Sequence, residues 1–259
     1  MKEETALTTV TPGGALALPD WMKQDQEALA LNTQFDQSEI RLPQLKLCQS
    51  MTPQRKRNDP NYIEGLAEGD FFNDASGYIY GTGPLRFTML KYWVNYIVFK
   101  PIDQGGGIVC RGIVGSDGVV RDEEGLPLRT TFGPKGEKPE VTKFMNYLFY
   151  LPDTKEIVWF SAKSTFLKTM RGFNSSLRAM SGIADFAKVF TLSSIATKNA
   201  AGQEFYIPVI PRLPIGIITN QVLYGELKQT ALDLRDKTID TSAAETAEDE
   251  TDGAENVPF

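Results

Sequence analysis

The sequence predicts a mainly β protein of the α+β class, and three observations support this prediction. Aromatic residues are concentrated in the middle of the chain, where 18 of the 27 lie between Phe87 and Tyr206. Apolar and polar residues alternate there over runs of strand length, which is the period of a half-buried strand. One run near residue 170 instead has apolar residues at helical spacing, so we expect a helix between the strands.

The N-terminal part of the chain is expected to form an arm and one strand. Residues 1–40 are rich in Thr, Ala, Gln and Gly, and we interpret them as an arm beside the folded body. Apolar and polar residues alternate over residues 41–47, which predicts a strand. A basic loop with Arg55, Lys56 and Arg57 follows between two prolines, and we interpret it as solvated.

The longest expected strand covers residues 86–100. Strands usually have about three to ten residues, so this run predicts a bent strand shared by two halves of a small barrel. Gly105, Gly106 and Gly107 then turn the chain into a strand at residues 108–114. Residues 116–140 are polar and contain several Gly and Pro residues, which predicts a long insert in the form of a mobile hairpin or flap.

Two strand pairs and two helices follow. The strands are expected at residues 143–151, 155–161, 187–197 and 204–210, and Pro208 places the last of them at an edge or a bulge. Ser164 is the expected N-cap of the helix between the pairs, and the apolar face of this helix consists of Phe166, Met170, Phe173, Leu177 and Met180. A second helix is expected from a cap at Asn220 to about residue 235.

From residue 86 onward the expected order is strand, strand, strand pair, helix, strand, strand. This order resembles that of the OB fold, a five-stranded barrel in which a helix connects the third and fourth strands. We therefore expect an OB-like five-stranded barrel within a domain of residues 41–236. The arm of residues 1–40, the long insert and the C-terminal helix are additions to it, and residues 237–259 form a separate tail.

Charge is distributed unevenly along the chain. The net charge is −6, which at first argues against nucleic acid as a partner, because phosphates repel an acidic surface. The six acids beyond residue 240 account for this whole balance and leave 27 basic and 27 acidic groups in the rest. Residues 141–235 carry eleven basic and six acidic groups, a net charge of +5. The positive charge is therefore concentrated in the C-terminal half of the body.

The chain ends in an acidic run followed by a short apolar segment. The acids are Glu245, Glu248, Asp249, Glu250, Asp252 and Glu255, and Val257, Pro258 and Phe259 follow them. A segment of this composition cannot bury a core, so we expect it to be disordered. The ending resembles the acidic tails of phage and bacterial single-stranded-DNA-binding proteins, which close on Ile-Pro-Phe or a bare Phe. Asn256 and Val257 before the proline depart from that pattern, as do the Thr, Ala and Gly residues between the acids.

The resemblance implies a function in DNA replication, recombination or repair. It implies sequence-nonspecific coating of single-stranded DNA, no catalysis, and recruitment of a polymerase, helicase or primase through the tail. The expected partner-binding residues are Glu248, Asp249, Glu250, Asp252, Glu255, Val257, Pro258 and Phe259. The tail is also expected to compete with DNA for the basic part of the body. Assembly with further copies of the chain stays open.

A protein that binds an unpaired strand needs cations along a groove for the phosphates and flat aromatic rings for the bases. In the long strand, one alternating face carries Tyr92 and Tyr96 between cationic ends. A bulge would exchange the faces, and Trp93 with Lys91 would then take their place. The expected DNA-binding residues are Arg86, Lys91, Tyr92, Trp93, Tyr96, Lys100, Arg111, Lys143, Tyr147, Trp159, Lys163, Lys168, Arg171 and Arg178.

Several other functions are disfavoured by the composition. The chain has no histidine, which removes imidazole as a base and as a metal ligand, and we expect no cofactor, no metal and no catalytic residue. The two cysteines, Cys48 and Cys110, are too few for a disulfide framework. No signal peptide or membrane span is expected, and the predicted location is the cytoplasm, that of the host for a phage protein.

Three alternatives remain open from the sequence. A nuclease would use carboxylates such as Asp117, Asp122, Glu123 and Glu124 to hold Mg²⁺, although a solvated loop explains them more simply. A phage structural or assembly protein would share the arms and the β-rich body. A strand-annealing recombination protein would share the substrate and the charge distribution.

Overall fold

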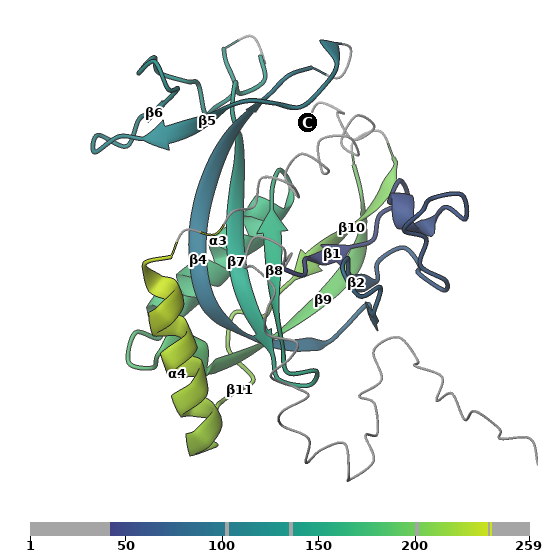
Figure 1. Cartoon of the computed structure of the whole chain (residues 1–259), viewed down its shortest axis with the longest axis vertical. Coiled ribbons are helices and arrows are strands. Elements are labelled where there is room, and N and C mark those ends of the chain that lie inside the picture. The colour runs from purple at the N-terminus through teal and green to yellow at the C-terminus, as the bar shows by residue number, and fades with distance from the viewer. Residues whose placement is uncertain (1–41, 102–103, 135–136, 200–201, 238, 240–259) are drawn as a thin grey trace, which may run out of the picture.

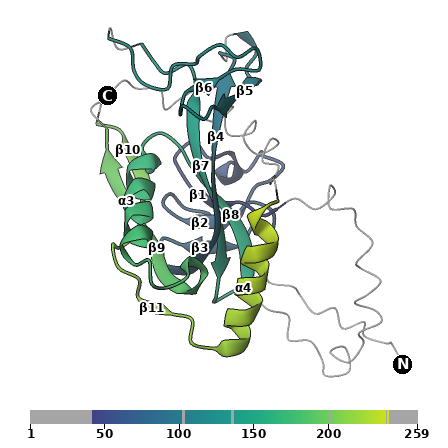
Figure 2. The same cartoon turned by 90° about the vertical axis from the view of Figure 1, so that its left-hand side faces the viewer.

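The computed structural model describes residues 42–101, 104–134, 137–199, 202–237 and 239. An eight-stranded, mainly antiparallel sheet curves strongly, and a small three-stranded sheet lies beside it (Figure 1). One helix packs on each side of the large sheet (Figure 2). The prediction of a mainly β protein of the α+β class is confirmed.

The element bounds follow the expected order closely. The small sheet contains β1 (Leu45–Leu47), β2 (Phe71–Asn73) and β3 (Ile79–Gly81). The large sheet contains β4 (Leu85–Phe99), β5 (Ile108–Val114), β6 (Val120–Arg121), β7 (Thr142–Leu151), β8 (Glu156–Ala162), β9 (Lys188–Lys198), β10 (Glu204–Val209) and β11 (Gly216–Ile217). The helices are α3 (Phe166–Ala179) and α4 (Gln221–Arg235), with 3-10 turns η1 (Pro53–Arg55) and η3 (Asp185–Ala187).

Strand β4 is the centre of the large sheet and changes partners along its length. Its first residues, from Leu85 to Phe87, pair with β9, and the stretch from Thr88 to Ile97 pairs with β7. Its last residues pair with β5. The register with β7 shifts between Met89 and Lys91, which marks a bulge and bends the strand. The prediction of one long bent strand is confirmed, but the closed small barrel whose two halves it was expected to share is not observed within the residues that the structure describes.

The sheet does not close into a barrel. Among the described residues no ladder joins β8 to β10, although β8 pairs with β7 and β10 pairs with β9. Strand β1 lies between them and makes a parallel bridge from Gln44 to Trp159. On the other side, the Gln49 side chain donates to the Tyr206 carbonyl oxygen at 2.8 Å and accepts from the Tyr206 N–H at 2.9 Å. The Gln49 side chain thus makes the two main-chain hydrogen bonds to Tyr206 of β10 that a neighbouring strand would otherwise make.

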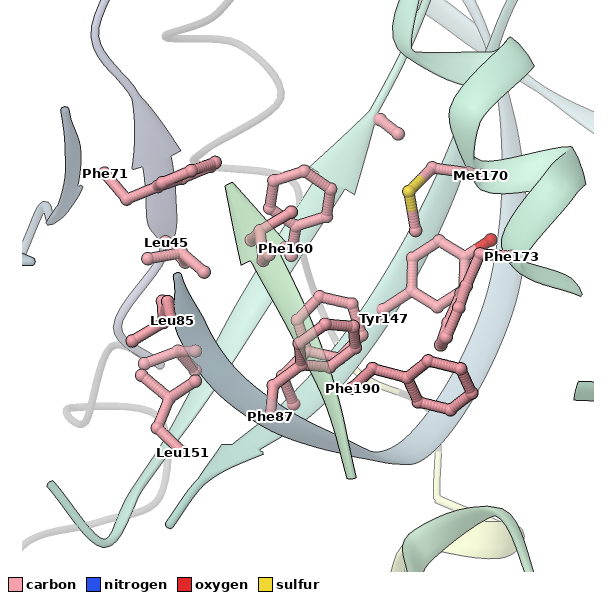
Figure 3. Packing of buried hydrophobic residues seen from close by; sticks show 14 of the residues in the cluster. Leu45, Phe71, Leu85, Phe87, Tyr147, Leu151, Phe160, Met170, Phe173 and Phe190 are labelled. Carbon is pink, nitrogen blue, oxygen red and sulfur yellow. The ribbon is translucent and has the colours of Figure 1, made fainter. Parts of the chain in front are cut away.

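The main hydrophobic core lies between the curved sheet and α3. Helix α3 inserts Met170, Phe173 and Leu177, which are buried as the helical spacing predicts. The Phe173 and Phe190 rings meet edge to face with centroids 5.0 Å apart (Figure 3). The ring centroids of Phe87 and Phe149 lie 4.3 Å apart. Such aromatic pairs add about 0.5–1.5 kcal/mol each to the free energy of burial. These rings fix the position of α3 on the sheet.

A second core lies on the opposite face of β4, β7 and β8, under α4. Leu90, Leu148 and Trp159 pack there against Leu227 of the helix. The Asn220 side chain accepts a hydrogen bond from the Leu223 N–H at 3.1 Å, so the expected N-cap of α4 is confirmed. The expected N-cap of α3 at Ser164 is wrong, because α3 begins after Thr165 and Ser164 has a positive φ of 47°.

The insert at residues 116–140 leaves the body at the end of the sheet. The insert joins the large sheet through β6, which forms a short hairpin with β5 (Figure 1). Large apolar side chains are at least 37% exposed on β5 and the insert: Val109, Ile113, Val114, Val119, Leu126 and Phe132. In the described part of the chain, no helix is long and apolar enough to span a bilayer.

Candidate nucleic-acid interface

The bulge in β4 decides which residues of this strand face α3. Before the bulge, Phe87 points into the main core. Side chains alternate along a strand, so an unbulged strand would place Lys91 and Trp93 on that face. The extra residue shifts the alternation by one and places Tyr92 there instead, opposite Tyr147 of β7.

Tyr92 and Tyr147 form the first part of the candidate site. Their ring centroids are 5.0 Å apart, and the Tyr147 hydroxyl donates to Asn174 Oδ1 of α3 at 3.0 Å. Burial raises the pKa of Tyr92, and a hydrogen bond with Asn174 partly offsets this effect. The phenol therefore stays neutral at neutral pH. Tyr92 is 39% exposed whereas Tyr147 is fully buried, so only Tyr92 presents a ring to solvent.

Tyr96 and Lys143 form the second part, further along β4. The two residues are directly opposite one another in the ladder, and residues in such a pair share a face. The Lys143 Nζ atom lies 5.5 Å from the centroid of the Tyr96 ring, which is cation–π distance. Because Tyr96 lies four residues beyond Tyr92, its ring continues the same face of the strand by about 13 Å.

Helix α3 supplies the cations beside these rings. Arg171, Asn174 and Arg178 are spaced three and four residues apart, so they lie along one stripe of the helix. Because Asn174 contacts Tyr147, this stripe lies next to Tyr92. Lys168, Arg171 and Arg178 are exposed and form no ion pair with any described residue. We call Tyr92, Tyr96, Lys143, Lys168, Arg171 and Arg178 the Tyr92 surface.

Five of the expected DNA-binding residues have structural roles instead. Tyr147 and Trp159 are buried in the two cores, and the Trp159 Nε1 atom donates to Asn146. Trp93 packs under α4, with its ring in the second core. The remaining two are cations with partners. Arg86 is paired with Asp153, and Lys91 donates to main-chain carbonyl oxygens at the end of α4. None of these five side chains is available on the Tyr92 surface.

The other three cations lie away from the Tyr92 surface. Arg111 stands opposite Ile97 in the β4–β5 ladder and therefore on the other face from Tyr96. Lys100 is exposed at the end of β4. Lys163 follows β8, with its Nζ atom 5.6 Å from the Phe144 ring centroid. The expected arm and the expected tail, with its partner-binding residues, fall outside the described residues.

Asn174 also belongs to the candidate site, although it was not among the expected residues because it is neither aromatic nor cationic. A signal was present in the sequence, since Asn174 falls between Arg171 and Arg178 on the same helical stripe. Among the described residues, the carboxylates of the insert are not gathered into a cluster that could hold a metal ion. Asp117 is ion-paired with Arg121, and this pairing holds the pKa of Asp117 well below its ordinary value. No group of three or more metal-binding side chains occurs among the described residues.

The fold and this surface define a mainly β protein with an aromatic and basic face beside one helix. Residues 10–240 match the model of the family described as Pam3 phage gp34-like protein, which is most of the chain. The protein therefore belongs to this phage protein family. Comparisons with curated proteins and with solved structures gave no match.

Proposed function

We propose that this protein binds single-stranded DNA without sequence preference and serves phage DNA replication or recombination. The observation that carries the proposal is the Tyr92 surface, which combines the exposed Tyr92 ring and the partly exposed Tyr96 ring with exposed cations of α3. Bases stack on aromatic rings with about 1–3 kcal/mol per base and with little dependence on sequence. The cations supply the phosphate contacts that make such binding sensitive to salt.

The connectivity supports an OB-like barrel as the scaffold. If β5 and β6, which stand between β4 and β7 in the chain, are left aside, strands β4, β7, β8, β9 and β10 follow the order of that fold, and α3 stands between the third and fourth of them. Strand β4 pairs with both β7 and β9, as the bent first strand of such a barrel does. In this proposal β1 fills the gap between β8 and β10 where the fifth strand would otherwise meet the third.

The tail extends the proposal to protein partners. Beyond residue 240 it carries six acids and no basic residue, and its last residues are apolar. We propose that the tail binds a replication protein such as a polymerase, helicase or primase. No catalytic step is proposed, and the cytoplasm of the host is the expected place of action.

A second candidate function is strand annealing or phage assembly. The exposed apolar side chains on β5 and the insert favour it, because soluble proteins rarely expose such a group without a partner surface. Oligo-dT binding followed by anisotropy separates the DNA-binding proposals from assembly. An annealing assay with electron microscopy of the complexes then separates simple coating from annealing.

A further inference from the structure

Two pockets adjoin one another at the start of α3. The first, of about 490 Å³, lies between β1, the end of β8 and the first residues of α3. The second, of about 360 Å³, lies between α3 and the strands β9 and β10. Both are lined by Ser164, Thr165 and Phe205, so they share part of one wall, and we call the two pockets together the depression. Volumes of this size are typical of sites for small organic groups.

The position of β1 explains the first pocket. Because β1 is joined to β10 by the Gln49 side chain rather than by a ladder, the two strands do not close over the space between them. Gly69, in the loop before β2, also packs closely on β10, since a Cβ added there would lie 2.5 Å from Cε1 of Tyr206. The gap is therefore held by specific contacts on both sides.

The lining combines aromatic side chains with cations. Phe160 is buried, while Phe166 and Phe205 are only partly buried. Lys163 lines the first pocket, whereas Lys168 and Arg171 line the second. The Ser161 hydroxyl, on a residue that lines the first pocket, has no hydrogen-bond partner among the described residues. Flat apolar surface, cations and a hydroxyl together match a nucleotide, with its aromatic base and its anionic phosphate.

Arg171 links this depression to the Tyr92 surface. It lines the second pocket and also stands on the α3 stripe that runs beside Tyr92. A DNA single strand that lies along the Tyr92 surface therefore reaches the second pocket while its phosphates stay next to cationic side chains. Phe205 stands where the two pockets meet, opposite Thr197 in the β9–β10 ladder.

We propose that the two pockets hold consecutive nucleotides of the bound single strand, with one base stacked on Phe205. Lys163, Lys168 and Arg171 contact the phosphates on either side of this base. The inference rests on the proposed function and extends it by giving the strand a path from β4 across α3 to β10.

The test uses the full-length chain with Phe205→Ala, and Phe132→Ala as the matched control. Phe132 is 60% exposed on the insert and lines neither pocket. We expect Phe205→Ala to weaken binding of fluorescent oligo-dT by about 5- to 150-fold, which corresponds to one lost stacking contact. Phe132→Ala should bind within about twofold of the wild type, and free thymidine monophosphate should not displace the oligonucleotide at equal nucleotide concentration.

Photocrosslinking of the wild-type protein to oligonucleotides with 5-iodouracil provides a readout that needs no variant. Crosslinks to the peptide that contains Phe205 or Phe166 support the inference. If wild-type binding is normal but crosslinks occur only at Tyr92 or Tyr96, and Phe205→Ala binds like the wild type, the inference fails while the proposed function survives. Displacement by free thymidine monophosphate would also overturn it. If the wild type does not bind oligo-dT at all, both fail.

Discussion

Tyr92 and Tyr147 stand directly opposite one another on β4 and β7, with ring centroids 5.0 Å apart, yet only the Tyr92 ring reaches solvent. The buried Tyr147 ring packs beneath the exposed Tyr92 ring. Asn174 Oδ1 accepts a hydrogen bond from the Tyr147 hydroxyl and thereby ties the pair to α3. Such support limits the orientations that the Tyr92 ring can adopt. A stacking surface that is fixed in advance loses less entropy when a base binds.

Replacing Tyr92 by Ala should weaken oligo-dT binding by about 1–3 kcal/mol, because one base loses its stacking partner. Tyr62→Ala is a matched control, since Tyr62 is 37% exposed against 39% for Tyr92 but lies in the loop before β2. Fluorescence anisotropy measures both variants. Equal affinities for the two variants would count against a stacking role of Tyr92.

Neutralising cations on α3 should change how binding depends on salt. Each phosphate contact contributes about −0.7 to the slope of the logarithm of the binding constant against the logarithm of salt concentration. Arg171→Gln and Arg178→Gln should therefore each make the slope shallower by about that amount. Lys228→Gln on α4, an exposed cation outside the Tyr92 surface, is the control. An unchanged slope in both arginine variants would contradict the proposed phosphate contacts.

Lys91 should matter for stability rather than for DNA. Its Nζ atom donates to the carbonyl oxygens of Leu234 at 2.6 Å and Arg235 at 3.3 Å, at the C-terminal end of α4, where the helix dipole also favours a cation. Lys91→Ala should lower the free energy of unfolding by about 1.5–3 kcal/mol, as measured by urea denaturation. Lys100→Ala, which removes an exposed lysine at the end of the same strand, should unfold like the wild type. A loss of DNA affinity in Lys91→Ala without a loss of stability would reverse this assignment.

The two cysteines should differ in their reactivity with iodoacetamide and in their effect on the stability of the fold at high pH. Burial raises the pKa of the Cys48 thiol from 9.0 to about 11, while Cys110 is only partly buried. A raised pKa in the folded state favours the protonated thiol, so its contribution to stability is complete below pH 9. It is lost as the pH rises from 9 to about 11. Cys48→Ala should remove this part of the pH dependence, and iodoacetamide should label Cys110 first at pH 8. Faster labelling of Cys48 would show that it is not buried.

Removal of residues 241–259 should leave DNA binding unchanged or stronger, because it deletes six acids and no basic residue. The same truncation should abolish binding to a phage or host replication protein in a pull-down from purified components. A full-length variant with Phe259→Ala tests the apolar end separately. If the truncated protein instead loses its affinity for DNA, the proposed role of the tail is wrong.

Local sequence patterns predicted the elements but not their closure. The bounds of β4, β7, α3 and α4 lie within about two residues of the expected ones, because alternation and helical spacing report directly on which side of an element is buried. The gap between β8 and β10 could not be predicted in this way. It depends on the Gln49 side chain, which replaces a strand partner over a separation of 157 residues.

The sequence predicted part of the candidate site, because alternation along a strand reports which side chains share a face. Tyr92, Tyr96 and Lys143 share a face, as alternation in β4 and the pairing with β7 require. Burial of Tyr147 and Trp159 depends on α3 and α4, which cover opposite faces of the sheet. The partner of Lys91 is likewise tertiary, since the end of α4 is more than 140 residues away in the chain. A sequence pattern gives the residue types of such a site, whereas packing decides which of them stay exposed.

Fluorescence titration of the full-length protein with oligo-dT at two salt concentrations tests the central claim most directly. The proposed function predicts saturable binding that weakens steeply from about 50 to 200 mM salt, together with quenching of the intrinsic tyrosine emission. Absence of saturable binding at the lower salt concentration, or an affinity that salt does not change, would contradict it.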